Sequence, residues 1–182
     1  MFRVLEGKKV NLRIVEKEDL ALGLEWINNP EYFGEHQPLS QQSRGELERQ
    51  YDRLTSDEKW FWVEKKNGTK IGTISYGPAG KAFDIGYNII PSERRKKYGT
   101  EAVGIVVDFL FLSRDTVRIE ARVDLRNVAS QKVLEKSGFR KEGRIRKDMF
   151  IRGEWRDLFL YSILREEWKE PKILTKRIKS ET

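Results

Sequence analysis

Hydrophobic and polar positions follow two different periods along this chain, which predicts a protein that mixes strands with helices. Apolar residues at every second position are typical of half-buried strands, and apolar residues three or four positions apart are typical of helices. By these patterns, and by short apolar runs, strands are expected at 9–15, 60–66, 70–76, 81–90 and 117–123. Helices are expected at 16–27, 43–54, about 100–113 and 127–138, and two further strands follow.

Turn signals divide these elements. Asn67-Gly68 is a strong hairpin signal, residues 77–80 form the next expected turn, and 29–42 is expected to be a loop. Three antiparallel strands in succession, flanked by helices, predict an α+β fold with a single mixed, mostly antiparallel sheet and helices on both faces.

A basic turn lies between the strand that stops at Pro91 and the helix that begins near Gly99. The first amides of a helix have no acceptor within the helix, and the helix dipole is positive there. A strand that leads through such a turn into a helix is therefore a candidate phosphate site.

Composition narrows the choice of function only a little. The chain has 182 residues, of which 38% are hydrophobic and 36% charged, with a formal net charge of +7. This charge suits an anionic cofactor, a nucleic acid or an acidic partner equally well. Cysteine is absent and His36 is the single histidine, so we expect no disulfide, no cysteine nucleophile and no metal centre.

The sequence also leads to expectations about domain organisation and cellular location. We expect one domain over 1–168 and a loose basic tail over 169–182. No long apolar segment opens the chain, so we expect no signal peptide, no membrane span and a cytoplasmic location.

Two blocks of sequence resemble the GNAT superfamily of acyltransferases. The first matches its pyrophosphate loop, with Arg94 in the leading position, Lys97 where the family has a glycine, and Gly99 at the later glycine. The second, 127–139, resembles the family segment in which an Asn opens a helix that closes in Gly-Phe. The residues that follow, through Leu164, are similar to the RimJ/RimL-like branch.

This resemblance implies a GNAT-like fold in which strands 81–90 and 117–123 splay apart and hold acetyl-CoA between them. It implies direct transfer of an acetyl group to an amine, without a covalent intermediate. A backbone amide near Ile89 or Ile90 is expected to polarise the thioester carbonyl. The expected cofactor-binding residues are Ile89, Ile90, Arg94, Arg95, Lys96, Lys97, Tyr98, Gly99, Thr100, Asn127 and Ser130.

The resemblance also suggests catalytic residues. Many family members use a tyrosine acid at the position of Leu134, so this chain departs from that pattern, and Ser130 is the candidate thiolate donor. The alternative is that Asn127 is only an N-cap and Ser130 only a helix residue. Glu120 is the candidate base. Other candidate bases are Asp84, Glu35 and His36, and a charged surface residue is the alternative interpretation for each of the four.

Aromatic residues allow two interpretations. Four of them are expected in the sheet core: Trp60, Trp62, Tyr76 and Tyr87. Four others either line an acceptor pocket or pack a loop onto the sheet: Trp26, Tyr32, Phe33 and Trp155.

The leading hypothesis is an N-acetyltransferase whose acceptor is the α-amine of a protein N-terminus, a ribosomal protein being one option. One alternative is a small amine such as a polyamine or an aminoglycoside. Another is an inactive RNA- or ribosome-binding module in which Lys97 blocks CoA. A monomer and a homodimer are both compatible with the sequence.

Overall fold

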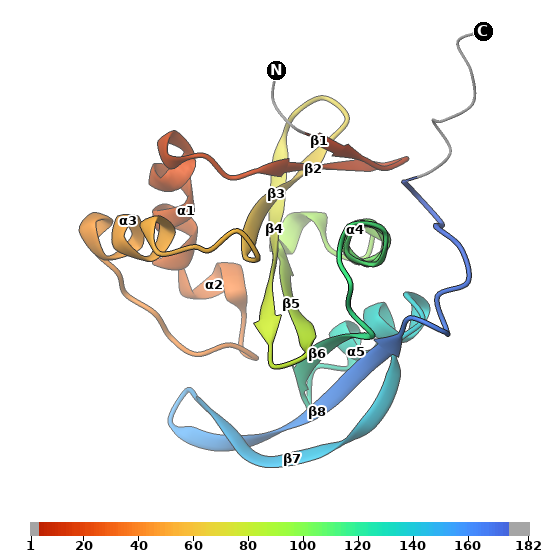
Figure 1. Cartoon of the computed structure of the whole chain (residues 1–182). Helices are drawn as coiled ribbons and strands as arrows, with labels where there is room; N and C mark the ends of the chain where they lie inside the picture. Colours follow the sequence, from red (N-terminus) through yellow and green to blue (C-terminus); the bar gives the residue numbers. More distant parts are fainter. Residues whose placement is uncertain (1–3, 175–182) are drawn as a thin grey trace, which may run out of the picture.

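The structure, a computed structural model, describes residues 4–174 and is built on one eight-stranded sheet (Figure 1). The strands are β1 (Val4–Glu6), β2 (Val10–Ile14), β3 (Lys59–Lys65), β4 (Lys70–Ala79), β5 (Ala82–Ile89), β6 (Arg118–Asp124), β7 (Arg140–Ile151) and β8 (Glu154–Leu164). The helices are α1 (Leu20–Ile27), α2 (Pro30–Phe33), α3 (Arg44–Asp52), α4 (Tyr98–Ser113) and α5 (Val128–Lys136), with short 3-10 turns η1 (Lys17–Asp19) and η2 (Pro91–Glu93).

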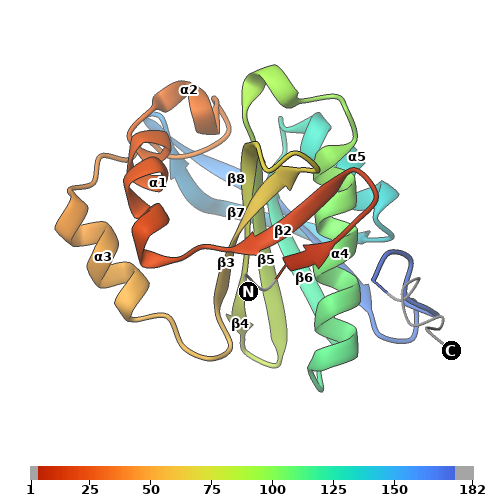
Figure 2. The same cartoon turned by 90° about the horizontal axis from the view of Figure 1, so that it is seen from above.

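The strand order across the sheet is β1-β2-β3-β4-β5-β6-β8-β7. Every neighbouring pair is antiparallel except β5 and β6, which run parallel. Helices α1, α2 and α3 cover one face, and α4 and α5 cover the other (Figure 2). The predicted α+β fold with one mixed, mostly antiparallel sheet is confirmed.

The turn between β4 and β5 corrects one expectation. The predicted turn at 77–80 comes too early, because β4 continues to Ala79, which pairs with Ala82. Pro78 is tolerated inside this strand for a simple reason. Pairing between β3 and β4 ends at Tyr76, so the side of Pro78 that lacks an N–H faces no neighbouring strand.

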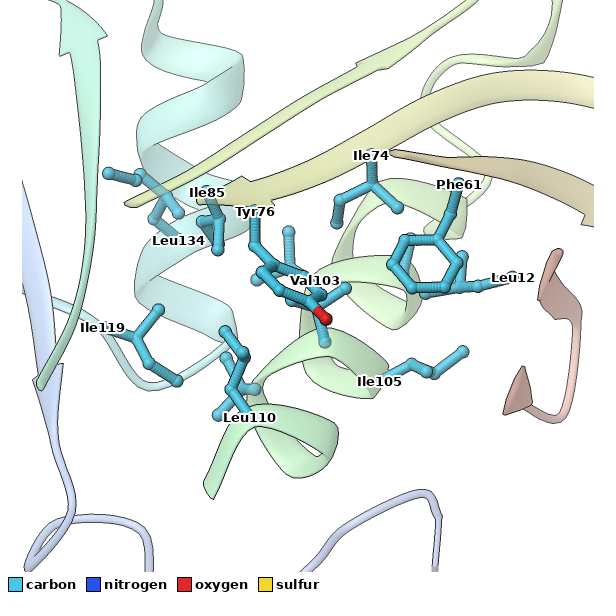
Figure 3. Packing of buried hydrophobic residues seen from close by; sticks show 14 of the residues in the cluster. Leu12, Phe61, Ile74, Tyr76, Ile85, Val103, Ile105, Leu110, Ile119 and Leu134 are labelled. Carbon is cyan, nitrogen blue, oxygen red and sulfur yellow. The ribbon is translucent and has the colours of Figure 1, made fainter. Parts of the chain in front are cut away.

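Helix α4 packs its apolar side against the sheet and supplies the centre of the larger core. Figure 3 shows Ile74, Tyr76 and Ile85 of the sheet beside Val103 and Leu110 of the helix. All five side chains are buried. The predicted core position of Tyr76 and the helical spacing of the α4 residues are therefore confirmed.

The opposite face carries a smaller core and an element that the pattern missed. Helices α1 and α3 pack on β3 there through Leu20, Leu47 and Trp62. The missed element is α2, which lies within the predicted loop. Asn29 caps it by accepting from the amide of Glu31, and a proline occupies its first turn, so an N-cap followed by Pro was the available signal.

Part of the predicted loose tail is fixed to α4. The buried Asp108 carboxylate accepts from the indole N–H of Trp168 and from the backbone amides of Lys172, Ile173 and Leu174. Residues 172–174 of the expected tail 169–182 thus contact α4, and residues 175–182 lie outside the described residues. Among residues 4–174, no helix has both the length and the apolar character needed to span a bilayer.

Candidate active site

The turn between β5 and α4 leaves six consecutive backbone amides without a protein acceptor. The N–H of Arg94 donates to the carbonyl of Pro91, and the N–H of Glu101 donates to the carbonyl of Lys97. The amides of residues 95–100, between them, make no hydrogen bond with any described residue. The last three open α4, where the dipole is positive. Such a run of free amides at a helix start binds anions such as a diphosphate.

The backbone of this turn is left-handed at two residues. The angle φ is 62° at Arg95 and 68° at Lys97. Glycine adopts this conformation freely, whereas other residues pay roughly 1–2 kcal/mol for it. Lys97 occupies the position of the expected family glycine, so the turn keeps the glycine conformation even though a side chain is present.

Arg94 uses its guanidinium to hold protein elements together. Its Nε donates to the carbonyl of Ile89 at 2.8 Å, and its Nη2 donates to the carbonyl of Tyr32 at 2.8 Å. The same Tyr32 carbonyl accepts from the side-chain Nδ2 of Asn88 at 2.9 Å. Arg94 therefore ties the end of β5 to α2, a role that the phosphate-loop resemblance did not suggest.

The remaining basic side chains of the turn divide into two groups. Lys96 donates to Glu93 at 2.9 Å and is thereby held by the protein. Arg95 and Lys97 make no ion pair or hydrogen bond within residues 4–174, and both are exposed. These two side chains are available to an anion bound at the free amides.

Next to the turn, β5 and β6 separate. They pair only through Phe83 and Asp84 of β5, although β5 continues to Ile89. The gap thus begins after Asp84 and widens toward the free amides. This confirms the expected splayed pair of central strands.

The backbone of β5 turns alternate amides toward this gap. The N–H of Ile90 donates to Ile71 of β4 at 2.9 Å. Because hydrogen-bonding groups alternate along an antiparallel pair, the amides of Ile89 and Tyr87 face away from β4 and into the gap. Of the two amides expected near the thioester carbonyl, that of Ile90 is engaged by β4 and that of Ile89 faces the gap.

Gly99 lies at the mouth of the gap. A Cβ placed on it would lie 3.7 Å from Cγ1 of Ile89 and 4.0 Å from Cγ2 of Val133, which are ordinary contacts. Residues 98–100 are each partly exposed. A small side chain fits here, but a large one would project between β5 and α5.

The start of α5 carries the candidate acid. Ser130 Oγ lies 2.7 Å from the hydroxyl of Tyr87, whose pKa is raised by burial and partly restored by this contact. Asn127 is the N-cap, since its Oδ1 accepts from the amide of Ser130 at 3.0 Å. Its Nδ2 makes no hydrogen bond within the described residues. Leu134 is fully buried in the core, so the position of the usual family tyrosine offers no donor.

Tyr87 is a site residue that sequence reasoning assigned only to the core. Alternation places it on the same face as Ile85 and Ile89, which is correct. The hydrogen-bond partner of its hydroxyl depends on how α5 crosses that face, and local sequence patterns do not predict this crossing.

Two carboxylates meet where the strands separate. Asp84 of β5 pairs in register with Glu120 of β6, so both side chains lie on the face covered by α1 and α2. Glu120 is 5% exposed. Nη2 of Arg118 lies 2.8 Å from its Oε2, so the two side chains form an ion pair, although they are not aligned for a hydrogen bond. Burial raises the pKa of Asp84 to about 6, the charge of Arg122 opposes this shift, and Glu120 adds to it.

Comparison with known proteins identifies this arrangement. The sequence profile of the Acetyltransferase (GNAT) domain matches residues 9–140. The chain belongs to the GNAT acetyltransferase family. It is 34% identical over 177 residues to "Probable N-acetyltransferase YjcK" of Bacillus subtilis, covering 88% of this chain and 97% of that protein.

Solved GNAT structures share the fold. The spermidine N-acetyltransferase of Vibrio cholerae, in complex with CoA and spermine, superposes with a TM-score of 0.80 at 22% identity, covering 89% of this chain and 99% of that one. The ribosomal-protein-S5-alanine acetyltransferase of Vibrio fischeri gives a TM-score of 0.74 at 26% identity, covering 92% and 100%. The chain is accordingly an acyltransferase of the acetyl-CoA-dependent N-acetyltransferase kind.

In this GNAT domain, the β7–β8 hairpin meets the loop after α2. Arg152 donates to the carbonyls of Pro30 and Gly34 at 3.0 and 3.2 Å. Arg156 donates to the carbonyl of Glu35 at 3.1 Å. The two segments therefore form one continuous border beside the face that carries Asp84 and Glu120.

The single histidine is part of this border. Nδ1 of His36 lies 3.0 Å from Oδ2 of Asp124, and the same oxygen accepts from Arg156 at 2.7 Å. The amide of Arg126 and the guanidinium of Arg156, together with His36, hold the pKa of Asp124 below its usual range, although burial opposes them. His36 is therefore engaged in a structural contact.

The aromatic residues separate into an outer and an inner group. Trp155 is 55% exposed and meets Phe150 edge-on at 5.7 Å, away from the inner group. Trp26, Tyr32 and Phe33 instead line a partly open cavity under α1 and α2.

Proposed function

We propose that this GNAT enzyme acetylates the α-amine of a peptide or protein N-terminus, as RimJ/RimL-like enzymes do, with the CoA diphosphate bound at residues 95–100. The cofactor assignment rests on the run of six free backbone amides at the start of α4. Acetyl-CoA supplies the activated acyl group, a thioester. The chain supplies binding, orientation and proton transfer.

The residues of the gap fit an extended cofactor arm. The amides of Tyr87 and Ile89 are free hydrogen-bond donors along one side of the gap, and the Nδ2 of Asn127 is a free donor at the start of α5. The exposed side chains of Arg95 and Lys97 add positive charge for the phosphates.

Transfer forms an N–C bond to the acetyl carbon and breaks the C–S bond, so the amine must lose a proton and the thiolate must gain one. We assign the donor to the hydroxyl of Ser130, which Tyr87 orients at 2.7 Å. We assign the acceptor of the amine proton to Glu120, with Asp84 beside it. An α-amine has an ordinary pKa near 8, so it needs little help to deprotonate.

The charges on the acceptor face support an α-amine over a polyamine. Two carboxylates are already ion-paired, Glu120 with Arg118 and Asp124 with Arg156, and burial raises the pKa of a third, Asp84. A polycation needs carboxylates that are not already neutralised, and the chain as a whole carries a charge of +7. Because the fold is similar to that of a spermidine N-acetyltransferase, polyamines are the alternative class of acceptor.

A thiol-release assay with acetyl-CoA tests this proposal. The panel contains peptides with free α-amines, the same peptides with blocked N-termini and a free lysine, spermidine, and an aminoglycoside. We expect release only with free α-amines, and mass spectrometry should find the acetyl group there. Spermidine or the aminoglycoside as the better acceptor, or no acceptor at all, would overturn the proposal.

The RNA-binding alternative has its own measurement. A ligand that binds only the folded state raises the melting temperature. We expect CoA to raise it and RNA to leave it unchanged; the reverse result would favour a binding module.

A further inference from the structure

A cavity of about 250 Å³ lies between the sheet and helices α1, α2 and α3. Five aromatic residues line it: Trp26, Tyr32, Phe33, Trp60 and Trp62. Its lining contains no Asp, Glu, Lys or Arg. An engineered apolar cavity of about 150 Å³ holds a benzene molecule, so this one has room for a single large side chain. The expectation that Trp60 and Trp62 serve only as sheet core is incomplete.

A glycine in the middle of α1 adds to the open space. A Cβ on Gly23 would lie 3.9 Å from Cη2 of Trp62 and 4.0 Å from Cδ2 of Leu47, which are ordinary contacts. Packing therefore does not require glycine, although glycine inside a helix costs about 1 kcal/mol relative to alanine. The absent side chain leaves volume in the cavity that a larger residue would fill.

Two buried polar atoms of the lining residues lack partners. The hydroxyl of Tyr32 and the indole N–H of Trp62 make no hydrogen bond with any residue between 4 and 174, and the two residues are 4% and 1% exposed. Thr73 lies close enough to lower the pKa of Tyr32 slightly against the effect of burial, but it forms no aligned hydrogen bond. Both atoms are donors, so an acceptor oxygen would complement them.

The electrostatics disfavour a cation in this cavity. The ammonium of Lys70 already lies 5.6 Å from the ring centroid of Trp62. No carboxylate in the lining offers a counter-charge. The occupant should therefore be uncharged.

Ser75 and Gly86 lie between the cavity and the gap that separates β5 from β6. Ser75 lines the cavity and pairs with Gly86 of β5. Gly86 has no side chain on this face, and a Cβ there would lie 3.6 Å from Oγ of Ser75. Asp84, where the gap begins, is two residues away on the same face.

From these observations we propose that the cavity binds the side chain of the acceptor's first residue, and that this side chain is uncharged and either aliphatic or aromatic. The backbone of that residue crosses Gly86 and brings its α-amine to the gap. The acceptor oxygen for Tyr32 or Trp62 is a backbone carbonyl of the peptide, since the side chain itself has none. This inference rests on the proposed function, because it needs a peptide acceptor.

The test compares peptides that differ only in their first residue, with alanine, leucine, phenylalanine, lysine or glutamate there. The wild-type chain should acetylate leucine and phenylalanine peptides with kcat/KM at least tenfold above the lysine and glutamate peptides. Gly23→Leu fills the cavity and Gly23→Ala is the matched control. Gly23→Leu should lose at least tenfold on the phenylalanine peptide and less than threefold on the alanine peptide, and Gly23→Ala, which fills less of the cavity, should lose less than Gly23→Leu on the phenylalanine peptide.

Each outcome has one meaning. If peptides are acetylated without regard to their first residue, or if Gly23→Leu affects all of them equally, the cavity assignment is overturned and the proposed function stands. If the wild-type chain acetylates no peptide, the proposed function fails and the assignment fails with it. A CoA-induced rise in melting temperature that is equal in Gly23→Leu and wild type establishes that the variant is folded.

Discussion

The hydroxyl groups of Tyr87 and Ser130 lie 2.7 Å apart, so a residue of the open strand β5 touches the first turn of α5. The Tyr87 hydroxyl is also 3.2 Å from the carbonyl of Ser130. When Tyr87 donates to Ser130 Oγ, the serine oxygen is held in place and its own proton is left for the thiolate. The orientation of the candidate acid therefore depends on a tyrosine from the opposite side of the gap.

Replacing Ser130 by alanine should lower kcat by about 100-fold, since a positioned general acid contributes about that much or more. Tyr87→Phe should lower kcat less, because the serine keeps its proton and loses only its orientation. Steady-state kinetics with a saturating peptide measure both. Ser113→Ala, at the far end of α4, is the control and should leave kcat unchanged. A Ser130→Ala enzyme with kcat within twofold of wild type would exclude this serine.

Gly99→Trp should abolish CoA binding while the fold persists, because the indole would project between Ile89 and Val133. Gly99→Ala makes only ordinary contacts and is the matched control. Calorimetric titration with CoA measures affinity, and circular dichroism checks the fold. Unchanged CoA affinity in a folded Gly99→Trp variant would remove this turn from the site.

Lys97→Gly should relieve the left-handed strain at this position, where φ is 68°. Lys96→Gly is the comparison, because φ of Lys96 is not positive and glycine there only adds freedom to the unfolded chain. We expect the unfolding free energy of Lys97→Gly to exceed that of Lys96→Gly by about 1 kcal/mol. Urea denaturation measures the difference; equal values would show that the turn stores no strain at Lys97.

Asp84 should make stability depend on pH in an identifiable window. Its folded pKa of about 6 lies above its ordinary value, so between about pH 4 and pH 6 the folded state holds more protons than the unfolded chain. Stability from this residue therefore falls as pH rises through that window. Asp84→Asn should melt higher than wild type at pH 7.5 and close to it at pH 4. The exposed Asp115→Asn should show no such trend, and a parallel trend in both variants would refute the assignment.

Asp108→Asn should destabilise the domain by about 3 kcal/mol, since a buried carboxylate that accepts several N–H groups is replaced by a group with its own donors. Asp52→Asn, on the surface of α3, should change stability by much less. Guanidinium unfolding measures both variants. A loss below about 0.5 kcal/mol for Asp108→Asn would mean that the segment at 168–174 adds little.

Much of the fold could be predicted because local signals and tertiary structure agree. The alternation of 9–15, the Asn67-Gly68 turn and the helical spacing after Gly99 each lead to the observed element. The turn at 77–80 was misplaced because the tolerance of Pro78 in a strand depends on where β3 stops. That information lies in another segment of the chain.

The candidate site likewise combines features that local sequence predicts with contacts that depend on distant segments. The free amides at 95–100 follow from a strand, a basic turn and a helix, which are local features. The contacts of Arg94 with Tyr32 and of Tyr87 with Ser130 join residues 62 and 43 positions apart in the chain. Such contacts depend on how helices cross the sheet, so residue type and spacing alone did not give them.

Arg94 links the proposed CoA site to the proposed acceptor side of the molecule. Its guanidinium hydrogen-bonds both to the end of β5 and to the carbonyl of Tyr32. An alanine scan of the basic turn would therefore mix two causes at this residue. If an Arg94 variant bound CoA more weakly, part of the lost affinity would come from disruption of α2 and of the aromatic cavity on the opposite face of the sheet. Arg95 and Lys97 make no ion pair or hydrogen bond within residues 4–174, so their replacement by alanine reports on the nucleotide more directly.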